Sequence, residues 1–105
     1  MPQFTVYRNP NPESKARIPY LLDVQSDLLA DLSTRVVAPL ARASGMKGHA
    51  IKSLMPTFEI EGEYVVMLTP QLAGVAGKVL GEPVANLIEH RADIVAALDL
   101  LITGI

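Results

Sequence analysis

The C-terminal stretch from Glu82 to Ile105 places the strongest limits on what this chain can fold into. Its side chains recur at alternating steps of three and four positions, which is the spacing of one face of an α-helix. The repeating positions are Val84, Leu87, Arg91, Ile94, Leu98, Leu101 and Ile105, and Ile88, Val95 and Ile102 widen the stripe. Pro83 suits the first position of a helix, and Gly104 suits the left-handed residue that ends one. The pattern therefore predicts one helix over this stretch.

Apolar residues continue to the end of this stripe, where chain termini are usually polar and mobile. Leu100, Leu101, Ile102 and Ile105 therefore need a partner, and the pattern leaves open whether that is the domain's own core, a second protomer or a target protein. Arg91 also falls on the stripe, so it either extends past the edge of the core or pairs with a buried carboxylate.

The size and composition of the chain indicate one domain over residues 1–105 that associates with itself. Its 105 residues support a single core, and 50% of them are hydrophobic. No apolar run approaches the roughly 20 residues that span a bilayer, and residues 1–10 lack the features of a signal peptide. The absence of cysteine excludes disulfides and cysteine-based zinc sites. We therefore expect a cytoplasmic protein that does not associate with membranes.

The charge balance favours protein partners over nucleic acid. The net charge is −2, whereas nucleic-acid binders need many cations to neutralise phosphates. Residues 1–58 carry seven Lys/Arg and four Asp/Glu, a balance of +3, and residues 59–105 carry two and seven, a balance of −5. A basic half and an acidic half suit binding to other proteins.

Short segments with a two-residue alternation precede the expected helix and are typical of half-buried strands. Turns rich in proline or glycine separate them, such as the loop that starts at Asn9-Pro10-Asn11-Pro12. Pro39 lies inside the third segment, which we therefore expect at a sheet edge or a bulge. The segments are Gln3–Arg8, Ile18–Gln25, Thr34–Arg42, a hairpin over Pro56–Thr69 that turns at Gly62, and Val75–Leu80.

Five or six strands followed by one helix predict an α+β fold that is mainly β. Parallel strands would need helices between them, so the sheet is expected to be antiparallel. It would form a partly open barrel whose open side the C-terminal helix covers. Residues Ala43–Lys52 are expected to connect two strands, with His49 as a solvated loop residue.

The sequence carries no motif for catalysis or cofactor binding. It has no glycine-rich phosphate loop, zinc-protease helix, nucleophile elbow or dinucleotide fingerprint. Three aspartates recur every four residues, but the expected strand removes the helical geometry that a shared metal would need. Two acidic residues and a histidine lie on the polar side of the helix, where no substrate cleft is expected. These two clusters are Asp23, Asp27 and Asp31, and Glu89, His90 and Asp93. We predict no cofactor, no metal and no catalytic residue.

An apolar pair, Leu28 and Leu29, interrupts the alternation after the second strand segment. Ser26 or Asp27 can cap a short turn there, which places the pair on a loop. The local pattern leaves open whether the pair packs into the core or forms part of a contact surface.

Six segments spread over the chain form a specific combination of motifs, in which DVQSD occurs together with a hydrophobic helix and a terminal Gly-Ile. The segments are QFTVY, LLDVQSDLL (Leu21–Leu29), RVVAPLA (Arg35–Ala41), VVMLT, VLGEPVANL and HRADIVAALDLLITGI. In these segments the whole chain resembles the CcdB-type toxins of plasmid and chromosomal toxin–antitoxin modules.

The resemblance implies a homodimer built on an SH3-like barrel with a long C-terminal helix. It also implies a toxin that is not an enzyme. Such a toxin binds the A subunit of DNA gyrase, traps gyrase on cleaved DNA and so causes double-strand breaks. A CcdA-like antitoxin would neutralise it, remove it from gyrase and repress the operon together with it, so its contact with DNA would be indirect.

The resemblance further implies a gyrase-binding site made of the last residues of both protomers and the apolar pair after DVQSD. By position these are Leu28, Leu29, Asp99, Ile102, Thr103, Gly104 and Ile105. The best-known plasmid toxin of the family has tryptophan where this chain has Thr103, asparagine at Asp99 and phenylalanine at Ile102. A tryptophan anchor contributes on the order of 1–2 kcal/mol to an interface. The departure implies a lower affinity for gyrase, compensating contacts or a shifted target, and the retained Gly104 and Ile105 favour the first two.

The alternative is an mRNA-cleaving ribonuclease toxin of the MazF type, which shares the barrel architecture. RNA cleavage needs a cationic groove and an acid–base group, and the acidic balance of residues 59–105 argues against it. A third possibility is an inactive relative that only binds the antitoxin.

Overall fold

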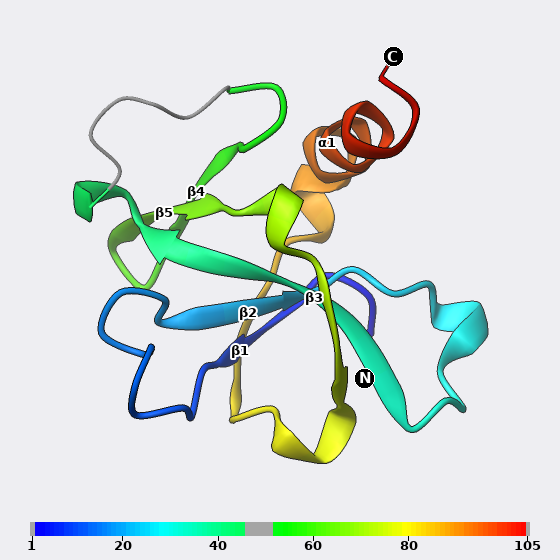
Figure 1. Ribbon diagram of the computed structural model, residues 1–105, viewed down its shortest axis with the longest axis horizontal. Coiled ribbons are helices and arrows are strands. Elements are labelled where there is room, and N and C mark those ends of the chain that lie inside the picture. The colour runs from blue at the N-terminus through cyan, green and yellow to red at the C-terminus, as the bar shows by residue number, and fades with distance from the viewer. Residues whose placement is uncertain (1, 46–51, 105) are drawn as a thin grey trace.

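The computed structural model describes residues 2–45 and 52–104 and consists of a curled antiparallel sheet with one α-helix packed against it (Figure 1). The strand order is β4-β5-β3-β2-β1-β7, and β6 pairs with a second stretch of β3. The strands are β1 Thr5–Arg8, β2 Tyr20–Asp23, β3 Thr34–Arg42, β4 Thr57–Ile60, β5 Glu63–Met67, β6 Ala73–Ala76 and β7 Pro83–Asn86. The predicted fold, α+β and mainly β with an SH3-like, partly open barrel, is confirmed.

Within residues 2–45 and 52–104, the helical segments are one α-helix and five single 3₁₀ turns. They are η1 Asp27–Leu29, η2 Ala43–Gly45, η3 Thr69–Gln71, η4 Gly77–Val79, η5 Ile88–His90 and α1 Arg91–Thr103. The predicted connection after β3 therefore starts with a helical turn, and His49 lies outside the described residues. No helix in the described ranges 2–45 and 52–104 is long and apolar enough to cross a membrane.

The β4–β5 hairpin confirms the clearest strand prediction. Its two turn residues, Glu61 and Gly62, have φ angles of 52° and 80°. Two consecutive positive φ angles are the requirement of the two-residue turn that matches the twist of paired strands. Phe58 and Ile60 point into the core from β4, and Val65 and Met67 do so from β5.

β3 is a central strand, so the prediction of an edge position from Pro39 is wrong. On one side β3 pairs with β2, and on the other it pairs first with β6 and then with β5. Pro39 lies where the partner changes between those two strands, and its carbonyl accepts a hydrogen bond from Leu68 N at 2.8 Å. The missing N–H of proline therefore costs little there.

The concave side of the sheet encloses the apolar core, which α1 closes. The helix contributes Ile94 and Ala97, both fully buried, while Val95 and Leu98 pack against the same cluster. The sheet and the segments beside it supply the larger share of the cluster: Phe4, Val6, Tyr20, Leu22, Val24, Ala38, Leu40, Phe58, Ile60, Val65 and Met67.

The predicted helix start at Pro83 is wrong, because residues 83–86 form β7. This strand pairs with β1, with Thr5 opposite Asn86 and Val6 opposite Ala85. The α-helix begins only at Arg91, which is exposed and takes no part in the buried stripe. The predicted end is confirmed, since Gly104 has φ 74° and its N–H donates to Leu100 O at 3.0 Å.

The expected last strand also differs from the structure. The strand β6 starts two residues earlier than predicted, at Ala73, and ends at Ala76, after which η4 replaces the second half of the expected segment. The strands Tyr20–Asp23 and Thr5–Arg8 lie inside their predicted ranges, and β3 has the predicted bounds.

Arg8 links the two edges of the curled sheet. Its guanidinium contacts Glu61 in the β4–β5 turn at 2.9 Å and Glu82, directly before β7, at 2.8 Å. The hydroxyl of Tyr20 donates to the same Glu61 carboxylate at 2.7 Å. These hydrogen bonds from Tyr20 and Arg8 lower the pKa of Glu61.

Candidate protein-binding surface

The apolar pair predicted on a loop is exposed and lies on the short turn η1. Leu28 is 95% exposed and Leu29 is 49% exposed. No residue of η1 is buried, so packing does not fix the conformation of the turn. Side chains from the DVQSD segment hold it instead.

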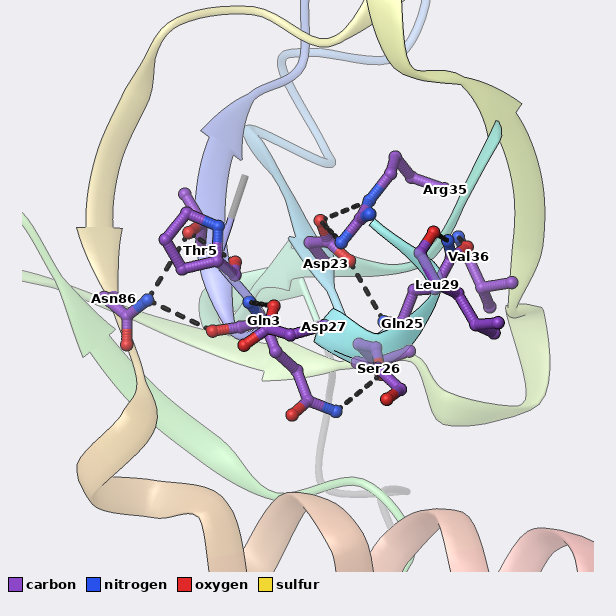
Figure 2. Close-up of polar contacts among 12 residues, drawn as sticks. Gln3, Thr5, Asp23, Gln25, Ser26, Asp27, Leu29, Arg35, Val36 and Asn86 are labelled. Carbon is purple, nitrogen blue, oxygen red and sulfur yellow. Dashed lines mark hydrogen bonds and ion pairs between the residues drawn. The ribbon is translucent and has the colours of Figure 1, made fainter. Parts of the chain in front are cut away.

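Two polar side chains fasten the start of η1 (Figure 2). The Ser26 hydroxyl accepts a hydrogen bond from Leu28 N at 3.1 Å, which is the usual role of an N-cap serine. The Asp27 carboxylate accepts from Gln3 N at 2.7 Å, so the turn is tied to the chain just before β1.

Gln25 connects the end of η1 to β3. Its side-chain oxygen accepts from Val36 N at 3.0 Å, and its Nε2 donates to Leu29 O at 3.0 Å. Its own backbone N–H donates to the Asp23 carboxylate at 3.0 Å. Only 6% of Gln25 is exposed, so this carboxamide bridges two backbone segments beneath the surface.

A buried ion pair supports this arrangement. The Arg35 guanidinium donates to Asp23 Oδ2 from Nε and Nη2, each at 2.8 Å, and both side chains are almost fully buried. Burial raises the pKa of the Asp23 carboxyl, although the Gln25 N–H and Arg35 act in the opposite direction. Burial also raises the pKa of Tyr7, and the nearby Asp23 carboxylate adds to that shift.

The second part of the predicted site is the end of α1. Ile102 is 74% exposed, so it lies outside the buried stripe on which Ile94 and Ala97 sit. The Thr103 hydroxyl donates to Asp99 O at 2.6 Å, one turn back in the same helix. That bond keeps the side chain close to its own backbone. Gly104 is exposed, and a Cβ at this position would meet no atom within 4 Å.

The two parts of the predicted site lie on different elements, η1 and the last turn of α1. No hydrogen bond or ion pair among the described residues joins them. Ile105, the remaining predicted site residue, lies outside the described residues. Figure 1 shows η1 and the end of α1 apart, so the predicted site consists, within one protomer, of two separate groups of residues, each with an exposed large apolar side chain.

Two exposed apolar residues beside η1 were missed by the sequence reasoning. Leu32 is 53% exposed and its N–H donates to Leu29 O at 3.1 Å, while Val36 is 38% exposed and bonds to Gln25. We call Leu28, Leu29, Leu32 and Val36 the loop patch. The signal that could have indicated Leu32 is the number of apolar residues after DVQSD on a segment without a two-residue or helical period, whereas Val36 lies in the predicted strand Thr34–Arg42 and gave no such signal.

Two residues of the polar clusters considered for catalysis and metal binding, Asp23 and His90, make contacts within the fold. Asp23 pairs with Arg35, and no group of three His, Cys, Asp or Glu in residues 2–45 and 52–104 could hold a metal ion. His90 packs its ring edge against Phe58, with centroids 5.1 Å apart. Asp93 borders an open cavity of about 520 Å³ together with Lys52 and other small or polar residues. These contacts assign His90 a packing role next to the start of α1.

Comparison with known protein families gives one result that covers nearly the whole chain. A family model described as CcdB protein matches residues 3–104. The match includes η1, the loop patch and the described end of α1.

Proposed function

Because the chain belongs to the CcdB protein family, whose members are toxins of toxin–antitoxin modules, we propose that it binds the A subunit of DNA gyrase. Bound to gyrase, it traps the complex in which the DNA is cleaved, and double-strand breaks result. It acts by binding and performs no catalysis of its own. It works in the cytoplasm, where gyrase and DNA are found.

The observation that carries this proposal is the exposure of large apolar side chains on well-held backbone. Leu28 at 95% and Ile102 at 74% are the most exposed large apolar residues of the described chain. Side chains of this kind cost little to order on binding when the backbone beneath them is already fixed. Two such groups suit a protein partner better than a small-molecule pocket.

A homodimer would bring the two apolar groups of each protomer into one symmetric surface. The edge of β6 that faces away from β3 has no partner among the described strands, and Ala73 and Gly74 on it are small and exposed. A second backbone can approach such an edge closely. A two-fold dimer also matches a two-fold target, since the same surface is presented twice. Sedimentation at the mass of one chain, at concentrations well above micromolar, would contradict the dimer.

Because this chain has Thr103 in place of a tryptophan, its affinity for the target has to come from other residues. Its hydroxyl is bonded to Asp99 O, so it offers only a methyl group to a partner. We propose that Ile102 and the loop patch supply most of the apolar contact area instead. The exposed carboxylate of Asp99, three residues before Ile102 in α1, would favour cationic side chains on the target.

The proposed regulation of the toxin also rests on its membership of the family. A CcdA-like antitoxin would bind the toxin, release it from gyrase and act with it as repressor of their operon. Contact with DNA would then occur only through gyrase or the antitoxin complex, in agreement with the net charge of −2.

A gyrase cleavage assay tests the proposal. Purified protein is incubated with DNA gyrase, ATP and supercoiled plasmid, and the reaction is stopped with detergent and protease. We expect linear plasmid to accumulate with the dose of the protein, and addition of the cognate antitoxin to abolish it.

The same preparation is incubated with total RNA as the contrasting arm. Discrete RNA fragments without linear plasmid would contradict the proposal and indicate the ribonuclease class of toxin. Antitoxin binding without either product would indicate an inactive relative.

A further inference from the structure

We propose that Gln25 is a positioning residue of the target-binding surface: it holds Leu28 and Leu29 in the conformation that the target binds, without touching the target. The inference rests on the proposed function, because it concerns the same surface. It assigns a role to a residue that lies beneath that surface.

The exposure of side chains changes sharply between Gln25 and the turn that follows it. Gln25 is 6% exposed, while Leu28, three residues later, is 95% exposed. A partner that covers Leu28 would therefore meet Gln25 only through the turn above it. Any influence of Gln25 on binding has to act through the conformation of η1.

Apart from Gln25, the end of η1 is held among the described residues only by local backbone bonds, including the one from Leu32 N to Leu29 O. None of its three residues is buried, and a single 3₁₀ turn is weakly held by its own backbone bonds. Ser26 and Asp27 fix its start. At its end, the bond from Gln25 Nε2 to Leu29 O ties the turn to the sheet, because the Oε1 of the same side chain accepts from Val36 N in β3.

The chemistry of the glutamine side chain suits this bridge. A carboxamide supplies a donor and an acceptor at once, and glutamine has the reach to join both segments. A glutamate would keep the acceptor for Val36 N and would turn a carboxylate oxygen toward Leu29 O, which can only accept. Its effect would therefore fall on the turn and spare the bond to β3.

Deeper in the protein, the Asp23–Arg35 pair fixes the backbone of Gln25. The Asp23 carboxylate accepts from Gln25 N at 3.0 Å and from Arg35 at 2.8 Å. The chain of contacts thus runs from the buried pair through Gln25 to the backbone oxygen of Leu29 (Figure 2).

The test compares Gln25→Met, which removes both side-chain bonds at similar length, with Gln25→Glu, which removes only the bond to the turn. Asn9→Leu is the matched control, since Asn9 is a carboxamide of similar burial, 8% exposed, that bonds to Ile18 O and Ser14 in another loop. Binding to the gyrase A subunit is measured by calorimetry, stability by urea unfolding, and exchange of the Leu28 and Leu29 amide protons by NMR.

We expect both Gln25 variants to bind the gyrase A subunit roughly tenfold more weakly, because a turn that is mobile when free must be ordered on binding. Asn9→Leu should lose stability while its affinity stays unchanged. In a Leu28→Ala background, Gln25→Glu should weaken binding by much less than it does alone, as coupled residues do. The Leu28 and Leu29 amides should exchange faster in both Gln25 variants.

Wild-type affinity in Gln25→Glu, or a full additive loss on top of Leu28→Ala, would overturn the positioning role. If the wild-type protein itself does not bind gyrase, the proposed function fails, and amide exchange then decides the inference alone. Unchanged exchange at Leu28 and Leu29 in a folded Gln25 variant would refute it.

Discussion

Arg35 illustrates, at the scale of single residues, how a buried charge can serve an exposed surface. Its side chain is almost fully buried, and its guanidinium donates twice to Asp23. An ion pair in such a place contributes little net stability, but loss of one partner leaves the other charge uncompensated. The pair matters for the surface because the Asp23 carboxylate also accepts a hydrogen bond from the backbone N–H of Gln25.

We predict that Arg35→Met lowers the free energy of unfolding by about 3–5 kcal/mol at neutral pH. Burial already raises the pKa of Asp23, so the folded state binds this proton more tightly than the unfolded chain does. Without Arg35 that difference grows, and the stability lost should shrink as the pH falls. Urea unfolding at about pH 8 and about pH 5 measures this.

Arg42→Met is the matched control, because Arg42 lies in β3 like Arg35. This substitution removes a partly exposed ion pair with Glu63. It should cost less than about 1 kcal/mol. An equal loss in the two variants, or a loss for Arg35→Met that does not depend on pH, would contradict the assigned role of the buried pair.

The roles of residues that depend on local backbone conformation could be predicted from the sequence. Gly62 in the hairpin turn and Gly104 at the helix end both have the positive φ that their positions implied. Burial of Asp23 and Arg35 could not be predicted in the same way, because it depends on how distant segments pair with β2 and β3, such as β6 beside the first half of β3. The exposure of Leu28 depends likewise on contacts between η1 and distant segments.

At the scale of elements, the segment before α1 shows where periodicity fails. Val84 and Leu87 are three residues apart and fit a helical stripe, but residues 83–86 pair with β1. Backbone hydrogen bonds to an available strand edge outweighed the local pattern, as tertiary context often does. The helix is therefore shorter than predicted, and β7 sets where it starts.

Gly81 is the residue that allows this pairing to begin. A Cβ at this position would lie 2.5 Å from the carbonyl oxygen of Arg8, which also accepts a hydrogen bond from Gly81 N. We predict that Gly81→Ala lowers the free energy of unfolding by about 1–3 kcal/mol, because the backbones of β1 and the chain before β7 must separate.

Gly45→Ala provides the comparison, since its Cβ would meet nothing within 4 Å and Gly45 lies in an exposed turn. Its effect should stay within about 0.5 kcal/mol. Thermal or urea unfolding of both variants checks this, and a Gly81→Ala protein as stable as the wild type would show that the two backbones have room to move apart.

At the scale of the whole molecule, one sheet joins features that are far apart in sequence. Arg8 connects the β4–β5 turn to the chain before β7, so it links both edges of the sheet. The helix closes the core with Ile94 and Ala97 and leaves Ile102 exposed at its end. The fold class could be predicted from strands that precede a single helix, whereas the separation of the two apolar groups within one protomer could not.

The most direct measurement is a calorimetric titration of the gyrase A subunit with three forms of the protein: the wild type, a variant that lacks residues 103–105, and Thr103→Trp. We predict measurable binding of the wild type, loss of at least about tenfold in affinity on truncation, and a gain of about tenfold with tryptophan. Truncation should leave the unfolding transition in place, because residues 103 and 104 are exposed. Absence of wild-type binding, or unchanged affinity after truncation, would contradict the account.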